Sequence, residues 1–389
     1  MSLKSKREYI EKARVDYQKA TKRIKGVILD HFVSVTKLSR KHSIRVLSKN
    51  YAPKREKAGR PKTYNQELLL PHVKRLWFTM EQIGSKKMKA ALAHWLPHYQ
   101  GPDVTNEIIG ALSKMSATTI ERYLKLIRFQ TRPYGRSTTK SSHFAKNRIP
   151  IRIHDWNRKE PGHFEADTVA HCGDNISGEY AHTVTATDIA TTWTENRAIF
   201  TKASGGVLEA LKDMELRLPF GIISFDFDNG SEFLNYPVME FLEKRDKPIK
   251  ISRSRPYRKN DQCYVEQKNY THVRQLFGYD RVEQRDLTTM MNEIYRDYWS
   301  PFQNFFIPSM KLIRKERFGA KIKKTYEKPQ TPYDRVMKSE HLSDEQKKKL
   351  TEKYKGLDPF VLKAQMEKKL KTYFSLLRKR ELSSVPVAA

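Results

Sequence analysis

Three carboxylates occur where they could bind metal ions together. Asp167 lies in a strand-like stretch, Asp228 ends a later apolar stretch before an Asn-Gly turn, and Glu266 lies early in a helical segment. Sixty residues separate the first from the second, and 37 separate the second from the third. Three acids meeting at one sheet edge would repel one another unless divalent cations neutralised them. Two Mg²⁺ (or Mn²⁺) ions about 4 Å apart can activate an attacking oxygen and stabilise a leaving one at a phosphodiester.

Each strand acid has a rival two residues earlier. Glu165 shares a strand face with Asp167, and Asp226 shares one with Asp228, because alternate residues of a strand point the same way. Spacing alone does not choose among the 44 acidic residues of the chain. The Asn-Gly turn favours Asp228, since it leaves this residue at the end of its strand.

The middle of the chain predicts the α/β layer structure that must position these acids. Alternating stretches rich in Thr and Val indicate strands, and apolar stripes of helical period lie between them. This order of strands and helices is typical of a mixed α/β domain. We expect strands at 163–170, 180–188, 192–200, 221–227 and 248–252, and helices at 203–217, 236–245, 260–277 and 286–306.

Charge divides the chain into three parts. Residues 1–150 carry 33 basic and 10 acidic side chains (+23), residues 151–300 carry 20 and 24 (−4), and residues 301–389 carry 22 and 10 (+12), which gives +31 in all. Basic flanks are suited to hold a phosphate backbone, and an acidic centre could gather carboxylates around metal. The alternative is an ordinary core with solubilising basic flanks.

The basic N-terminal part predicts two all-α helix-turn-helix domains, at 1–50 and 65–128, with basic linkers at 51–64 and 129–155. Ser39 is the expected N-cap of the last helix in the first domain, and Thr118 with Glu121 has the spacing of a capping box in the second. The alternatives are basic helical bundles and solvated linkers. The residues expected to contact DNA are Arg40, Lys41 and Arg45 in the first domain, Arg60 in a linker suited to a minor groove, and Arg122 and Lys125 in the second domain.

The C-terminal region, 307–389, is basic and is expected to be mainly helical, with a strand at 321–326 and helices at 343–355 and 358–378. We expect it to contribute to DNA binding and oligomerisation. One apolar stripe must pack on its own chain or on another subunit, and we expect it to help hold subunits together, or to brace the basic segment against a partner's DNA, in the DNA-bound complex. The stripe consists of Leu362, Met366, Leu370, Tyr373 and Leu377.

Several classes of protein are excluded. No apolar run approaches the roughly 18 residues of a membrane-spanning helix, mean hydropathy is −0.74, and no secretory signal follows Met1. The only two cysteines, Cys172 and Cys263, exclude a disulfide scaffold and fit a reducing compartment. His171 beside Cys172 lacks a partner pair at zinc-ligand spacing, so we interpret both as structural.

Three motifs carry a more specific resemblance. They are Glu165-Ala166-Asp167-Thr168-Val169-Ala170-His171-Cys172-Gly173, Asp228-Asn229-Gly230-Ser231-Glu232-Phe233, and Arg253 to Gln262 followed by Val265-Glu266-Gln267-Lys268-Asn269. The chain resembles DDE transposases of the retroviral-integrase type, and more narrowly bacterial insertion-sequence transposases with an integrase catalytic region. The motif likeness covers about 160–300, and the N-terminal helical region fits the same family over about 5–128.

The resemblance implies an RNase H-like core at 156–306, with a mixed five-stranded sheet and with Asp167, Asp228 and Glu266 as catalytic residues holding two Mg²⁺ or Mn²⁺ ions. The enzyme would bind the terminal inverted repeats of an insertion sequence, cleave at the ends and join the 3′-OH ends to target DNA, as a dimer or higher oligomer. Its place would be the bacterial cytoplasm, at the nucleoid, with no membrane partner. Around the last motif, the residues expected to hold DNA, or else to form a solvated basic face, are Arg258, Lys259, Gln262 and Lys268.

The chain departs from retroviral integrases at both ends. It has no His-His-Cys-Cys zinc module, and the tail after residue 307 does not resemble a small barrel. Two alternatives stay open: an RNase H-like nuclease that cuts DNA without joining it, and a DNA-binding regulator with an inactive core.

Overall fold

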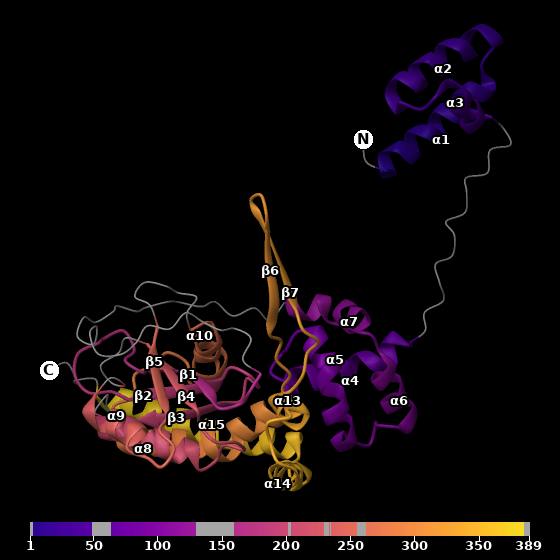
Figure 1. Cartoon of the computed structure of the whole chain (residues 1–389). Helices are drawn as coiled ribbons and strands as arrows, with labels where there is room; N and C mark the ends of the chain where they lie inside the picture. Colours follow the sequence, from indigo (N-terminus) through magenta and orange to yellow (C-terminus); the bar gives the residue numbers. More distant parts are fainter. Residues whose placement is uncertain are drawn as a thin grey trace. The chain divides into compact units, whose positions relative to one another are not determined.

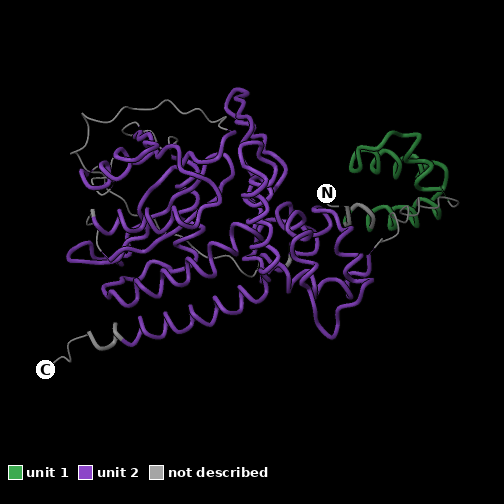
Figure 2. Tube along the Cα trace, turned by 60° about the horizontal axis from the view of Figure 1, so that its bottom comes forward, with its two compact units in different colours: residues 1–63 green, residues 64–389 purple. Residues whose placement is uncertain are grey.

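The computed structural model describes residues 3–48, 64–129, 159–200, 204–228, 233, 235–254 and 262–384. The chain divides into two compact units, residues 1–63 and residues 64–389 (Figure 2). The expected linkers 51–64 and 129–155 lie almost wholly outside the described residues. The ranges 65–128, 156–306 and 307–389, expected as separate domains, all fall within the second unit.

Unit 1 is a three-helix unit made of α1 (Leu3–Lys19), α2 (Lys22–Thr36) and α3 (Arg40–Leu47). The expected cap of α3 is confirmed, since the Ser39 side chain accepts a hydrogen bond from the His42 N–H. Lys37 turns the chain between α2 and α3 in the left-handed conformation, with φ of 56°. A small apolar core holds the helices together and consists of Ala13, Leu29, Phe32, Val46 and Leu47.

Unit 2 opens with four helices: α4 (Gln66–Thr79), α5 (Ser85–Trp95, followed by the 3₁₀ turn η1, Leu96–His98), α6 (Asn106–Lys114) and α7 (Ala117–Phe129). The capping residue expected for α7 is wrong. The helix begins at Ala117, and the Ser116 hydroxyl accepts the Thr119 N–H at 3.1 Å. These helices pack on the C-terminal part of the chain, because the Trp95 indole N–H donates to the Phe306 carbonyl at 3.0 Å and its ring meets that of Phe360.

A mixed five-stranded sheet forms the centre of unit 2, which confirms the predicted sheet. Its strands are β1 (His163–Ala170), β2 (His182–Asp188), β3 (Thr194–Ile199), β4 (Ser224–Phe227) and β5 (Lys250–Arg253), in the order β3-β2-β1-β4-β5. Neighbours β3, β2 and β1 are antiparallel, whereas β4 runs parallel to both β1 and β5. Figure 1 shows α8 (Ser204–Glu215) and α9 (Tyr236–Glu243) on one face and α10 (Cys263–Lys268) on the other.

The two helices expected after the sheet are interrupted by π-helical turns. The first consists of α10, η2 (Asn269–Arg274) and α11 (Gln275–Phe277); the second consists of α12 (Arg285–Glu293), η3 (Ile294–Trp299) and η4 (Phe302–Phe306). A π turn adds a residue to the helical repeat and so rotates the following side chains relative to an α-helix.

The C-terminal region contains a hairpin of β6 (Leu312–Phe318) and β7 (Lys321–Tyr326), then α13 (Pro332–Lys338), α14 (Asp344–Lys355) and α15 (Pro359–Ser384). Strand β7 was predicted and β6 was not. The apolar stripe of α15 packs on its own chain, since Met366 and Tyr373 are fully buried in the main core of unit 2. The expectation that this stripe holds subunits together is therefore wrong. No helix among the described residues is long and apolar enough to cross a membrane.

Asp188, at the end of β2, is a buried anchor beneath the start of β1. Its carboxylate accepts the N–H groups of Gly162 at 2.8 Å and His163 at 3.2 Å, and the N–H and hydroxyl of Thr191 at 2.7 and 2.6 Å. Gly162 has a φ of 112°, and a Cβ there would lie 2.5 Å from the Gly221 carbonyl oxygen, so no side chain fits. Asp188 thus joins β1 to the turn between β2 and β3.

Replacing Asp188 by Ala is expected to lower the free energy of unfolding by about 3 kcal/mol, because it leaves several buried donors without an acceptor. Thermal and urea denaturation of the full chain measure this loss. Asp174→Ala, which removes an exposed carboxylate, is the control and should change stability by less than about 0.5 kcal/mol. Equal stability of both variants would contradict the anchoring role of Asp188.

Candidate active site

The pairing of β1 with β4 places four acids in two rows. Glu165 lies opposite Asp226 in this parallel pair, and continuing the register by two residues sets Asp167 beside Asp228. The first row is buried, with Glu165 1% and Asp226 3% exposed, whereas the second row is half-buried. Carboxyl ends of parallel strands are where α/β sheets bind ligands. The second row therefore lies nearer to where a substrate could approach.

Glu165 fastens α10 to β1. Its Oε2 accepts the N–H groups of Tyr264 at 2.9 Å and Val265 at 3.0 Å, in the first turn of α10. The first N–H groups of a helix have no partner within the helix, and a carboxylate is a favourable acceptor for them. Glu266 is the next residue along, so the buried Glu165 determines where the backbone of Glu266 lies.

Asn269 orients Asp167 from the same helix. Its Nδ2 donates to Asp167 Oδ2 at 2.6 Å, while Asp167 Oδ1 accepts the Thr168 N–H at 2.7 Å. Asn269 and Glu266 are three residues apart, a spacing that puts two side chains on one side of a helix. Glu266 of α10 thus lies within one helical turn of the residue that contacts Asp167, and its side chain is exposed.

Acidic side chains are concentrated around this part of the sheet. Burial raises the pKa of Glu165 to about 8, and the carboxylates of Asp226 and Glu266 also raise it, against the two backbone hydrogen bonds that lower it. Burial also raises the pKa of the Cys263 thiol to about 12, with Glu165 and Glu266 adding to the effect. Such a group of acids favours a nearby cation.

Asp167, Asp228 and Glu266 offer only oxygen ligands, which hard cations such as Mg²⁺ prefer. The hydrogen bonds to Asp167 leave it further lone pairs, since a carboxylate has about four acceptor sites. The donor chemistry therefore fits a magnesium site. Within the described ranges, the side chains are not assembled into a group of three or more His, Cys, Asp or Glu that could hold a metal ion.

Two residues expected to hold DNA beside α10 point into the protein. Gln262 is buried, and its Nε2 donates to the Asp226 carbonyl at 3.2 Å. Lys268 is half-buried, with its Nζ 3.2 Å from His272 Nε2, and burial lowers its pKa to about 7 together with nearby Lys87 and Arg335. Their positions favour a role in shaping the site over contact with DNA. Arg258 and Lys259 lie outside the described residues.

His171 lies in the core. Its Nε2 is 2.8 Å from the Thr183 hydroxyl, and burial lowers its pKa to about 3, so the ring is uncharged at neutral pH. The Cys172 thiol is free. This geometry agrees with a structural interpretation of both residues.

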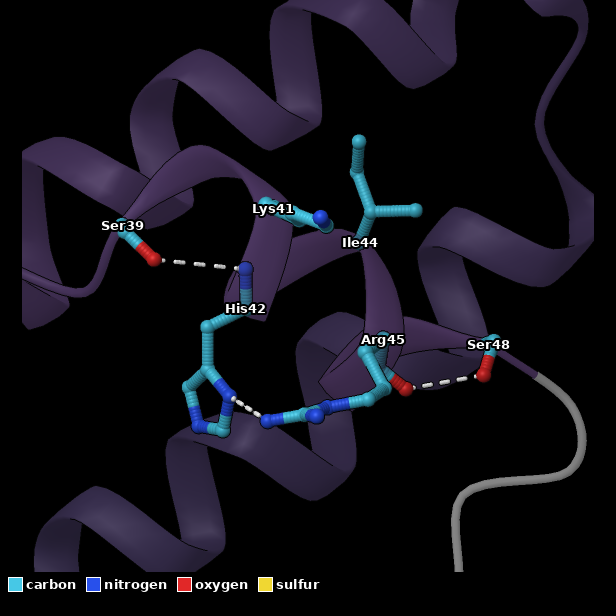
Figure 3. A pocket seen from close by; sticks show the side chains of 6 residues that line it. All are labelled: Ser39, Lys41, His42, Ile44, Arg45 and Ser48. Carbon is cyan, nitrogen blue, oxygen red and sulfur yellow. Dashed lines mark hydrogen bonds between the residues drawn. The ribbon is translucent and has the colours of Figure 1, made fainter.

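Two of the three residues expected to contact DNA on α3, Lys41 and Arg45, line an open pocket (Figure 3). Lys41 and Arg45 are exposed, and an Arg45 Nη is 2.6 Å from His42 Nδ1. Arg40 is exposed and forms an ion pair with Asp30 of α2.

On α7 of unit 2, Arg122 and Lys125 are both exposed. Arg60 lies outside the described residues. Contact of these side chains with DNA stays a prediction.

Replacing Glu165 by Ala is expected to reduce the rate of the reaction catalysed at this site by about 100-fold. The start of α10 loses its anchor, and a shift near 1 Å at a reacting group has an effect of that size. The isosteric Glu165→Gln retains an acceptor oxygen and should recover much of the loss. A merely structural role would lower stability and turnover together in both variants. Unfolding curves measured beside single-turnover rates separate the two cases, and equal turnover of Ala and Gln variants would contradict a positioning role.

The chain shows similarity to known proteins in structure and in sequence. No family model matches the chain. Among solved structures, the catalytic core domain of BIV integrase is 14% identical, with 46% of this chain and 96% of that chain covered at a TM-score of 0.27. The simian T-cell lymphotropic virus intasome in complex with the PP2A regulatory subunit B56 gamma is also 14% identical, with 43% and 55% covered at a TM-score of 0.27.

A curated protein is far more similar in sequence. The uncharacterized protein y4rM of Sinorhizobium fredii (strain NBRC 101917 / NGR234) is 36% identical over 342 residues, which cover 86% of this chain and 96% of y4rM. Identity of this level over nearly the full length of both proteins means that the chain belongs to the same family as y4rM.

Proposed function

We propose that the chain is a DNA transposase of the DDE type, which binds the terminal inverted repeats of an insertion sequence, cleaves at the ends and joins the 3′-OH ends to target DNA. The observation that supports this most is the half-buried pair of Asp167, within β1, and Asp228, directly after the neighbouring β4, with the helix of Glu266 fastened to β1. Acids in this arrangement suit phosphodiester chemistry that depends on divalent metal.

Asp167, Asp228 and Glu266 are the residues that would hold two Mg²⁺ ions, whose contribution is to neutralise the phosphodiester and activate the attacking oxygen. The remaining residues keep these acids in place. Glu165 holds the first turn of α10, and Asn269 fixes one carboxylate oxygen of Asp167. Because water and a 3′-OH can attack in turn at the same centre, no Ser or Tyr nucleophile is required.

Basic side chains outside the acidic centre would hold the DNA. Residues 1–150 carry 33 basic and 10 acidic side chains, a net charge of +23, and they include the exposed cations of α3 and α7. Neutralising phosphates releases counterions, so affinity for DNA should fall steeply with salt. Since one chain offers one set of three acids, joining two ends would need at least a dimer on DNA.

A strand-transfer assay with precut end DNA tests the proposal. The proposal expects inverted repeats on either side of the gene, from which the end sequence is taken, and Mg²⁺ or Mn²⁺ is added to the full chain. Joining of the 3′ ends to a second duplex is the expected result. Cutting of branched or duplex DNA without joining would support the nuclease instead, and DNA binding without any chemistry in either metal would support the regulator.

A further inference from the structure

The β6–β7 hairpin stands on a rigid base. Arg335, which is 9% exposed, donates to the hydroxyls of Thr192 at 2.9 Å and Ser309 at 2.8 Å and pairs with Glu327 just after β7. The ammonium of Lys311, just before β6, donates to the Ala190 carbonyl at 3.0 Å. Both ends of the hairpin are therefore fixed to the turn between β2 and β3 of the central sheet.

Beyond this base the hairpin extends away from the rest of unit 2 (Figure 1). Strand β7 is exposed along its whole length, and β6 is exposed at all but two positions. A sheet of two strands without a core on either face is marginally stable by itself. The apolar side chains near its tip are exposed as well, with Phe318 61% and Ile322 52% accessible. The exposed faces of this arm are therefore available to a partner.

The arm is strongly basic. Residues 312–326 carry six basic side chains and one acidic side chain, which is a net charge of +5. The basic residues are Arg314, Lys315, Arg317, Lys321, Lys323 and Lys324.

The two faces of the arm differ. Lys315 lies directly opposite Lys324 across the strands, and Arg317, two residues on, shares their face, which carries no acid. The other face holds Arg314, Lys321 and Lys323 together with Glu316, and Glu316 pairs with Arg314 at 2.7 Å. Like charges directly opposite each other destabilise a strand pair. The face that carries Lys315 is therefore suited to bind an anion between its basic side chains.

We propose that the β6–β7 hairpin is a DNA-binding arm, whose face of Lys315, Arg317 and Lys324 lies on the phosphate backbone as the ribbon enters the major groove of a duplex. That groove of B-form DNA is about 12 Å wide and admits a two-stranded ribbon. The deep, narrow major groove of A-form RNA does not admit one, so the shape of the arm favours DNA. The inference rests on the proposed action of the chain on DNA, and it identifies the arm as one part of the chain that holds the duplex.

The test compares three variants of the full chain that each remove three positive charges. Lys315→Gln with Arg317→Gln and Lys324→Gln alters the proposed face, and Arg314→Gln with Lys321→Gln and Lys323→Gln alters the opposite face. The matched control replaces exposed cations of α14 and α15: Lys348→Gln, Lys368→Gln and Lys371→Gln. Equilibrium binding to a fluorescent 30-base-pair duplex is measured in EDTA over a range of salt concentrations, so that no cleavage occurs.

The first variant is expected to lose at least about tenfold in affinity near 0.1 M salt, with a plot of log K against log salt flatter by about 2.7, since each phosphate contact contributes about 0.9. The other two variants should each lose less than about threefold. Equal losses in the first variant and the α14–α15 control would overturn the arm, and equal losses on both hairpin faces would overturn the choice of face. Tighter binding of the unaltered chain to duplex RNA than to DNA would overturn the choice of partner.

The same measurements separate this inference from the proposed function. If the unaltered chain binds no DNA, the proposed function fails. If it binds DNA and the first variant binds as tightly, only the arm fails. Because all the altered side chains are exposed, melting curves of the three variants should match that of the unaltered chain, which confirms that affinity and not folding has changed.

Discussion

Replacing Asp167, Asp228 or Glu266 singly by Ala is expected to reduce both cleavage and joining by at least about 100-fold while DNA binding stays within about threefold. Each change removes one proposed metal ligand, and losses of 10- to 100-fold are already usual for residues that only support ligands. The cations that would hold DNA lie elsewhere, in the basic flanks. Nicking and strand transfer in Mg²⁺, with binding measured in EDTA, give the two readouts side by side.

The buried row supplies the control for this prediction. Asp226→Asn, within β4, and Asp228→Asn, directly after it, are the same chemical change two residues apart, but Asp226 is 3% exposed and accepts the Ser252 hydroxyl at 3.3 Å. We expect Asp228→Asn to abolish chemistry and Asp226→Asn to retain a measurable part of it. The reverse order of activities would show that the buried acids, and not the half-buried pair, bind the metal.

The sheet could be predicted because its signal is local. Alternating Thr and Val gave β1, β2 and β3 within a few residues of their observed bounds. Strand β6 was missed since its sequence, Leu-Ile-Arg-Lys-Glu-Arg-Phe, has no apolar face, and the structure shows why: neither side of the arm packs on a core. Propensity and periodicity predict strands that bury one face, and they do not predict an exposed two-stranded ribbon.

Local sequence patterns could not predict which residues support the candidate site. Glu165 is 99 residues from Tyr264, whose N–H it accepts, so its role exists only once α10 docks on β1. The inward position of Lys268 also depends on a contact outside α10, because its Nζ lies 3.2 Å from His272 Nε2 in the π turn that follows. From the sequence, Glu165 was a rival of Asp167. The structure makes it the residue that holds the helix of Glu266.

The α7 cap shows the limit at shorter range. Ser116 and Thr118 are both good N-cap residues, and Thr118 has Glu121 at the spacing of a capping box. The helix nevertheless begins at Ala117, and Glu121 pairs with Arg128 at 2.6 Å at the other end of α7. Ser116 therefore caps the helix in place of Thr118, and Glu121 takes part in an ion pair instead of a reciprocal cap.

Removal of α15 is expected to unfold unit 2. The helix contacts both α5 and α11. The Phe360 ring, at its start, lies 5.0 Å from that of Trp95, and the Tyr373 ring lies 5.1 Å from that of Phe277. Lys369 also pairs with Glu293 at 2.8 Å. Burying a large apolar side chain stabilises a fold by about 1.5–3 kcal/mol, so the buried side chains of α15 together approach the 5–15 kcal/mol of a typical domain. Those with less than 8% exposure are Leu362, Met366, Tyr373 and Leu377.

A chain ending at residue 357 should therefore lose cooperative unfolding, DNA cleavage and joining together. Two point variants make the same test within a folded chain. Met366→Ala should lower the free energy of unfolding by about 2–5 kcal/mol, since Met366 is fully buried. Val361→Ala, five residues away and 50% exposed, should change it by less than about 0.5 kcal/mol. Full joining activity in the shortened chain would mean that α15 is not part of the fold that supports the acids, and equal stability of the two point variants would mean that its stripe is not buried there.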